Sequence, residues 1–200
     1  MSWFVPLSVA FVVIFLAELG DKTQLITISF ASKYPRLPVF LGVFLAMSIV
    51  TIIGVAVGAV LVSIIPIQTV KVLSGLIFIG FGVWTLISKE EGLDEGEGEI
   101  ETSKYQEFKK GKVFSTAFLM TALAEFGDKT QLAAIALTAQ YGEPLSVYIG
   151  AVLAFAVIVG IGVVLGRKIS EKVESKWIEM GSGILFIVLG IVFIVEALFF

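Results

Sequence analysis

Long apolar runs alternate with short polar stretches along the whole chain. A helix of about 20 apolar residues crosses the ~30 Å hydrocarbon core of a bilayer. Six runs reach this length, so the pattern predicts an all-α membrane protein with six transmembrane helices. The predicted helices cover residues 4–30, 39–65, 69–88, 113–139, 145–165 and 177–199.

Two of these runs contain a charged segment near the middle, with nearly the same sequence. Residues 18–25 read ELGDKTQL and residues 125–132 read EFGDKTQL, so one position in eight differs. Each charge placed at membrane depth is unfavourable by about 3 kcal/mol or more. The presence of the same charged set in both runs indicates a functional site, for which the rest of the chain is the scaffold.

The similarity of the two halves extends beyond these segments. A shift of 107 residues superimposes Glu18 on Glu125, and a shift of 108 superimposes later small residues. The chain is therefore predicted to contain an internal duplication. Since each copy has three helices, the second copy enters the membrane from the opposite side, which gives two inverted three-helix repeats. The later equivalent pairs are Gly42 with Gly150, Gly54 with Gly162, Gly58 with Gly166, Ser74 with Ser182, Gly75 with Gly183 and Gly82 with Gly190.

A charged stretch separates the two repeats. Residues 89–112 are rich in glutamate, glycine and lysine and are predicted to be a solvated linker. The predicted organisation is a first repeat at 1–88, the linker at 89–112 and a second repeat at 113–200. Basic residues concentrate on the side of the membrane that holds the linker. This side is therefore predicted to be cytoplasmic, with both termini outside.

Composition limits the chemistry that the chain can perform. With 58% hydrophobic residues and a mean hydropathy of +1.01, the chain is expected to be a multi-pass membrane protein. It has no cysteine and no histidine, which excludes thiolate and imidazole ligands. Any bound metal must therefore be held by oxygen, and any proton relay must use carboxylates.

The repeated motif permits two local structures. In a continuous helix, Glu18, Asp21 and Lys22 share one face. Alternatively, Gly20 interrupts the helix, Asp21 caps a second half-helix, and Gln24 takes the third position of a capping box. The glycines favour a kink or a break, and the sequence leaves the choice between them open.

Brought together, the two copies supply four carboxylates and two ammonium groups, a net charge that a divalent cation neutralises. Oxygen ligands favour Ca²⁺, Mn²⁺ or Mg²⁺. Desolvation and mutual repulsion favour proton binding when the cation is absent, which is a physical route to cation–proton exchange. The predicted ligands are Glu18, Asp21, Glu125, Asp128, Gln24 and Gln131, and the four carboxylates are also the predicted proton carriers. The predicted supporting residues are Gly20, Lys22, Thr23, Gly127, Lys129 and Thr130, with Thr27 and Thr121 as further neutral oxygens.

The paired Glu-x-Gly-Asp-Lys-Thr motifs, three helices per half and acidic central segment resemble the transmembrane protein 165/Gdt-type cation–proton antiporter family over essentially the whole chain. The resemblance implies export of Mn²⁺, and in some members Ca²⁺, from the cytosol in exchange for protons. Organellar members carry an N-terminal extension that this sequence lacks, so a prokaryotic plasma (inner) membrane is expected. The expected partners are lipid, metal ions and protons, with no nucleic acid and no cofactor besides the transported cation. The signature implied by the resemblance comprises Glu18, Asp21, Lys22, Thr23, Glu125, Asp128, Lys129 and Thr130.

Other interpretations fit parts of the pattern. The glutamate and lysine of each copy could form structural ion pairs, yet the excess of acid over base argues for more. The chain could instead be an exporter of amino acids or other small solutes, but such a substrate needs fewer clustered carboxylates than the two motifs supply. An intramembrane aspartyl protease would use Asp21 and Asp128 as a dyad, but a lysine directly after each aspartate fits this poorly, so no enzyme is expected. A passive channel remains an alternative interpretation. The sequence does not determine the preferred cation, the coupling stoichiometry or whether the protein forms a homo-oligomer.

Overall fold

The computed structural model describes residues 3–87, 112–165 and 175–199, and the elements within these ranges are α-helices. The predicted all-α class is therefore confirmed. The predicted linker lies outside the described residues except for Lys112, and so does most of the charged stretch after the fifth predicted helix. The helices are α1 (Phe4–Glu18), α2 (Lys22–Lys33), α3 (Arg36–Ile64), α4 (Ile67–Ile87), α5 (Val113–Glu125), α6 (Lys129–Tyr141), α7 (Pro144–Leu165) and α9 (Ser175–Phe199).

Apolar helices dominate the described chain. Two of them, Arg36–Ile64 and Pro144–Val164, are able to cross a membrane by length and composition. These segments and the shorter apolar helices fall within the six runs that the sequence predicts, apart from a few terminal residues. The shorter apolar helices are Phe4–Glu18, Gln68–Trp84, Val113–Glu125 and Gly183–Phe199.

The first and fourth predicted helices are each broken near the middle. Residues 19–21 separate α1 from α2, and residues 126–128 separate α5 from α6. Gly20 and Gly127 have φ angles of 83° and 82°. Glycine adopts this left-handed conformation without the strain that a Cβ would bring. The choice between kink and break is thus decided in favour of a break in both copies, and the six predicted helices are found as eight helical segments among the described residues.

Glutamine side chains stabilise both breaks in the same way. Oε1 of Gln24 accepts a 2.7 Å hydrogen bond from the N–H of Gly20. Oε1 of Gln131 accepts a 2.8 Å hydrogen bond from the N–H of Gly127. Each glutamine stands at the third position of its half-helix, as in a capping box, but it bonds the residue before the N-cap rather than the N-cap itself. Each bond satisfies a backbone donor that the break leaves without a helical partner.

Small residues allow the long helices α3 and α7 to approach the broken helices closely. A Cβ placed on Gly42 of α3 would lie 2.7 Å from the carbonyl oxygen of Phe114 in α5. A Cβ placed on Gly150 of α7 would lie 2.3 Å from the carbonyl oxygen of Leu7 in α1. The two glycines are equivalent in the duplication, and so are their two neighbours. Since α3 also packs on α6 and α7 on α2, each long helix packs against the broken helices of the other half.

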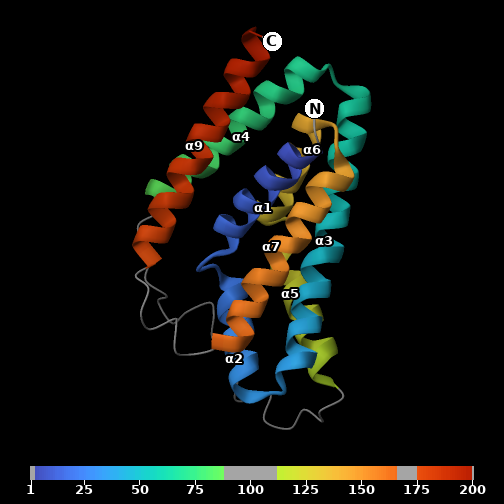
Figure 1. Ribbon diagram of the computed structural model, residues 1–200, viewed down its shortest axis with the longest axis vertical. Coiled ribbons are helices and arrows are strands. Elements are labelled where there is room, and N and C mark those ends of the chain that lie inside the picture. The colour runs from blue at the N-terminus through green and yellow to red at the C-terminus, as the bar shows by residue number, and fades with distance from the viewer. Residues whose placement is uncertain (1–2, 88–111, 166–174, 200) are drawn as a thin grey trace.

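Helices α4 and α9 form a pair beside this bundle (Figure 1). Glycines line their crossing: a Cβ on Gly75 would lie 2.7 Å from the carbonyl oxygen of Gly190, and one on Gly82 would lie 2.5 Å from that of Gly183. The marked N and C ends lie together at the upper end of Figure 1, here termed the termini end. Helix α2 ends and α3 begins at the opposite end.

Two apolar clusters form the core. The first includes Val43 and Met47 of α3 and Phe155 of α7, each at most 1% exposed. The second includes Phe78 of α4 and Leu137 of α6, both fully buried, together with residues of α9. The second cluster therefore seats the α4–α9 pair on α6.

Candidate cation and proton site

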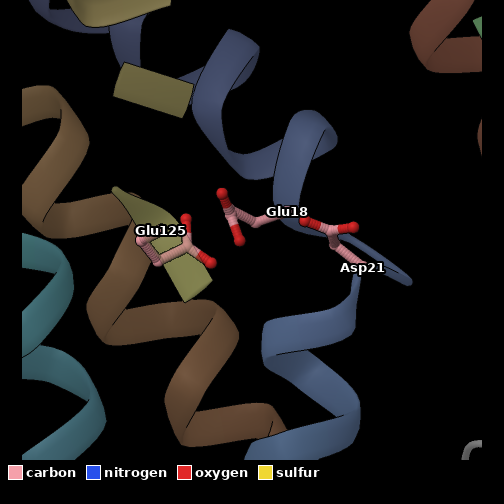
Figure 2. A group of neighbouring side chains, drawn as sticks. All are labelled: Glu18, Asp21 and Glu125. Carbon is pink, nitrogen blue, oxygen red and sulfur yellow. The ribbon is translucent and has the colours of Figure 1, made fainter. Parts of the chain in front are cut away.

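The two helix breaks meet, and their carboxylates converge. One carboxylate oxygen each from Glu18, Asp21 and Glu125 lies within 4.8 Å of the other two. Figure 2 shows Glu125, from the second half, facing Glu18, while Asp21 lies on the other side of Glu18 at the first break. Glu18 and Glu125 are only 1% and 2% exposed. Three of the four predicted carboxylates are therefore gathered in one buried cluster between the two halves.

Each glutamate is bound by a threonine of the opposite half. The hydroxyl of Thr23 donates a hydrogen bond to Oε1 of Glu125, and the hydroxyl of Thr130 donates one to Oε1 of Glu18. Both threonines are buried. The two hydrogen bonds are equivalent, because the shift of 107 residues turns one into the other. The predicted supporting residues Thr23 and Thr130 thus lie directly on the glutamates, each across the boundary between the repeats.

An ion pair also joins the two copies. Nζ of Lys129 lies 3.1 Å from Oδ1 of Asp21, so a lysine of the second motif pairs with an aspartate of the first. Both side chains are largely shielded, at 24% and 18% exposure, which strengthens the attraction relative to an exposed pair. The side chain of Lys22, the equivalent lysine, lies outside the described part of the structure. Lys129 therefore offsets part of the negative charge of the carboxylate cluster.

The fourth predicted carboxylate, Asp128, holds the start of α6. Its Oδ1 accepts a 2.8 Å hydrogen bond from the backbone N–H of Lys129. Asp21 occupies the equivalent N-cap position of α2 without such a side-chain bond and pairs with the lysine instead. Asp128 thus caps its half-helix, and Asp21 faces the cluster and pairs with Lys129.

The predicted glutamine ligands are already engaged in the backbone of the breaks. Oε1 of each accepts the glycine N–H described above, and Nε2 of Gln131 also donates to the carbonyl oxygen of Val50 at 3.4 Å. Coordination of a cation by Gln24 or Gln131 would therefore use the second lone pair of an oxygen that stabilises the break.

Two carboxylate oxygens at the centre have no donor among the residues that the structure describes. Oε2 of Glu18 and Oδ2 of Asp21 are buried, and neither accepts a hydrogen bond from any residue that the structure describes. A buried anionic oxygen without a partner is unfavourable by at least about 1–3 kcal/mol. A hard cation is the ligand that such oxygens prefer, and two or three carboxylates are a common basis for binding one. The donor set therefore fits a divalent cation, with a proton as the alternative occupant.

The two further threonines named from the sequence differ in their contacts. The hydroxyl of Thr27 donates a 2.7 Å hydrogen bond to the carbonyl oxygen of Thr23, one helical turn earlier. The hydroxyl of Thr121, one turn before Glu125, is fully buried and has no hydrogen-bond partner among the described residues. The oxygens of both hydroxyls keep lone pairs for a ligand, and the Thr121 hydroxyl has in addition no described acceptor for its proton.

A second polar cluster, which the sequence analysis missed, lies between α4, α6 and α9. Nζ of Lys71 lies 2.8 Å from Oε1 of Glu196, and Nε2 of Gln140 donates a 3.2 Å hydrogen bond to Oε2 of the same glutamate. Its residues stand near helix ends, where charged and polar side chains ordinarily reach water, so the sequence contains no signal that they meet.

Apolar helices packed around two broken helices, with buried carboxylates where the breaks meet, are typical of membrane transporters with an ion site. The chain matches the sequence profile of the family described as divalent cation/proton antiporter GDT1 over residues 6–93 and 113–199. It belongs to this family. The resemblance drawn from the paired motifs is therefore confirmed. The predicted activity is confirmed at the level of divalent cation/proton antiport. This activity is transport and not enzymatic catalysis.

Curated relatives agree with this assignment. GDT1-like protein 5 of Arabidopsis thaliana is 28% identical, over 88% of this chain and 90% of its own length. GDT1-like protein 5 of Oryza sativa subsp. japonica is 29% identical, over 88% of each chain. A GDT1-like protein of Schizosaccharomyces pombe is 28% identical, over 93% of this chain and 80% of its own length. No solved structure matches the chain.

Proposed function

We propose that this antiporter exports Mn²⁺, and Ca²⁺ as an alternative cation, from the cytosol in exchange for protons. Glu18, Asp21, Glu125 and Asp128 bind the cation and carry the protons. The observation that carries the proposal is the convergence of three carboxylates within 4.8 Å, with two buried oxygens that no described residue satisfies. The family supplies the class of transport, and the cluster supplies a site for it.

The choice of cation follows from the ligands. The chain has no cysteine or histidine, so soft thiolate and imidazole coordination is absent, and hard oxygen donors remain. Mg²⁺ demands near-ideal octahedral geometry and loses its water reluctantly, whereas Ca²⁺ and Mn²⁺ accept carboxylate-rich sites with fewer restrictions. Carboxylates held by two helix breaks and by threonine hydroxyls therefore favour Mn²⁺ or Ca²⁺.

Exchange for protons follows from the charge of the cluster. When the cation leaves, the carboxylates repel one another in a buried setting, and protonation relieves this repulsion. Glu18 and Glu125 are the central proton carriers, because they are the most deeply buried carboxylates of the cluster and face each other. The same oxygens thus serve the cation in one half of the cycle and the protons in the other.

The proposed architecture is six membrane spans arranged as two inverted three-helix repeats, at residues 1–88 and 113–200, joined by the linker at 89–112. Its support is the exchange of contacts between equivalent residues. The pair Thr23–Glu125 matches Thr130–Glu18, and the contact of Gly42 with α5 matches that of Gly150 with α1. In each span that carries the motif, two consecutive half-helices take the place of one helix.

The proposed location is a plasma or inner membrane, with both termini outside and the linker in the cytoplasm. The concentration of basic residues on the linker side supports this orientation. The position of both chain ends at the termini end of the bundle agrees with it (Figure 1). Cysteines introduced at Gln68 and Ser103 should then label from opposite sides of the membrane, and labelling from the same side would contradict the topology.

Purified protein reconstituted in liposomes tests the transport. Mn²⁺ uptake should follow an imposed pH gradient that is acidic inside, and should fall when Ca²⁺ competes outside. Uptake that is the same with and without the gradient would indicate a passive channel and would exclude antiport. Uptake of amino acids in place of cations would exclude the proposed substrate.

A further inference from the structure

The two half-helices that follow the breaks differ in exposure, although they are equivalent in the duplication. Ser29 of α2 is half-buried and Ser32 is exposed. Their equivalents in α6, Ala136 and Ala139, are each only 2% exposed. α6 is therefore covered at the termini end, whereas α2 is open along the same face at the opposite end.

The position of the α4–α9 pair accounts for this difference. α4 packs against α6, and α9 packs against α1, so the pair covers the two half-helices that form the termini end (Figure 1). The equivalent contacts would join α9 to α2 and α4 to α5. Neither is among the extensive helix contacts of the residues that the structure describes. The pair thus breaks the symmetry of the repeats by lying on one end only.

Polar contacts hold the pair in this position. Glu196 of α9 bonds both Lys71 of α4, at 2.8 Å, and Gln140 of α6, at 3.2 Å. Lys71 and Glu196 are 16% and 29% exposed, so these bonds are partly shielded from solvent. One helical turn away from Gln140, the hydroxyl of Ser74 donates a 3.3 Å hydrogen bond to the carbonyl oxygen of Ala136. Three helices are therefore joined through one carboxylate.

The duplication does not repeat this cluster. The position equivalent to Gln140 holds Lys33, and the position equivalent to Glu196 holds Ser88. The position equivalent to Lys71 holds Glu179, so the charged residues at the equivalent positions are one lysine and one glutamate. A carboxylate that can accept from both an amide and an ammonium group is encoded only for the termini end. This contrasts with the central site, where the carboxylates, lysines and threonines are all duplicated.

We propose that Lys71, Gln140 and Glu196 form a latch that keeps the termini end closed in the state seen here. The latch opens when the α4–α9 pair moves from α1 and α6 toward their equivalents, α5 and α2. This rests on the proposed antiport, because exchange between two sides requires each end to open in turn. In an inverted repeat, the second state is obtained by exchanging the roles of the two halves.

Glu196 and Gln140 act on transport as positioning residues. Gln140 stands near the end of α6, and α6 begins with Lys129, which pairs with Asp21 of the site. A helix is stiff over this length, so release of its far end allows movement at the site. The latch therefore sets the balance between the closed and the open termini end without contributing a ligand.

Single cysteines can report this balance, because the natural chain has none. Ala136→Cys and Ser29→Cys are matched reporters at equivalent positions, and in detergent a thiol reagent reaches both ends of the protein. Glu196→Gln should raise the labelling rate of Ala136→Cys about threefold to tenfold, the change expected from the loss of one charge-assisted bond. The same substitution should lower the labelling rate of Ser29→Cys, because the α4–α9 pair then covers α2 for more of the time.

Two further variants complete the test. Glu143→Gln removes an exposed carboxylate from the loop that follows α6 and should leave both rates unchanged. The double variant Lys71→Glu/Glu196→Lys restores an ion pair, and the amide of Gln140 can serve either charge, so the rates should return toward the unmodified values. If both reporters label faster in Glu196→Gln, the cluster is a structural clamp and the latch is wrong. Unchanged rates would also overturn it.

Failure of the latch and failure of the proposed antiport give different results. If proton-coupled Mn²⁺ uptake is present but the two reporters do not move in opposite directions, the antiport stands and the latch falls. If the two labelling rates change in opposite directions as expected, but Mn²⁺ uptake does not depend on the pH gradient, the three residues control a conformational change and the proposed antiport is wrong.

Discussion

The hydroxyl of Thr130 donates a hydrogen bond to the buried carboxylate of Glu18, although 112 residues separate the two in the sequence. The equivalent bond joins Thr23 to Glu125. Each half of the protein therefore supplies the donor for the acid of the other half, and the two glutamates are held where the repeats meet. Since both halves contribute to each bond, neither half contains a complete site.

Thr130→Val keeps the shape of the side chain and removes the donor to Glu18. The loss of a hydrogen bond to a buried charged group corresponds to about 1–3 kcal/mol, so the half-saturating Mn²⁺ concentration should rise on the order of tenfold. Thr130→Ser retains the hydroxyl and should transport like the unmodified protein. Mn²⁺ uptake into liposomes over a range of concentrations measures both variants, and a valine variant with unchanged half-saturation would show that the bond does not matter for binding.

Lys129→Met removes the positive charge that lies 3.1 Å from Asp21. The carboxylate cluster then has less compensation in the absence of cation, so Mn²⁺ should bind on the order of tenfold more tightly, while its release and the turnover become slower. Calorimetric titration of the purified protein with Mn²⁺ measures the affinity. Lys129→Arg keeps the charge and serves as the control. Weaker binding by the methionine variant would mean that the lysine orients the carboxylates rather than balancing them.

Glycine substitutions separate backbone conformation from close packing. A Cβ on Gly127 meets no atom within 4 Å, but its φ of 82° makes alanine unfavourable there by about 1–2 kcal/mol. A Cβ on Gly150 would lie 2.3 Å from the carbonyl oxygen of Leu7, so α1 and α7 must move apart. Gly150→Ala should therefore lower the thermal unfolding midpoint in detergent more than Gly127→Ala.

Gly80→Ala is the control for these substitutions, because its Cβ meets nothing within 4 Å and it lies in a helix. Alanine is the better helix former, so its unfolding midpoint should stay the same or rise. If Gly127→Ala behaved like Gly80→Ala, the left-handed break would not be required by the native fold.

The charged motif and the duplication could be predicted from sequence because both are patterns of residue type. Apolar runs predict the helices, and nearly identical charged segments at a shift of 107 residues predict two copies of one site. The break at Gly20 could not be decided, because a glycine permits a left-handed angle but does not require it. The bond from Gln24 to the backbone, and the packing of α7 against α2, exist only in the folded protein.

The position of the α4–α9 pair could not be predicted from the sequence either. Under the repeat relation, a contact of α4 with α6 is equivalent to a contact of α9 with α2. The relation gives no reason why the first contact should form rather than the second. In the structure, Glu196 bonds both Gln140 and Lys71, three residues far apart in the chain that belong to no motif. Likewise, the exchange of threonine partners between the halves depends on tertiary packing, although the threonines themselves were identified.

The central claim is that Glu18 and Glu125 bind the cation and the protons by turns. Its most direct test records Mn²⁺ uptake and proton release together in the same liposomes, for the unmodified protein, Glu18→Gln and Glu125→Gln. The unmodified protein should take up Mn²⁺ and release protons in a fixed ratio, and each glutamine variant should lose both fluxes, by at least about a hundredfold if the lost ligand contributes about 3 kcal/mol. Glu143→Gln should keep both. A glutamine variant that still exchanges Mn²⁺ for protons in the original ratio would contradict the claim.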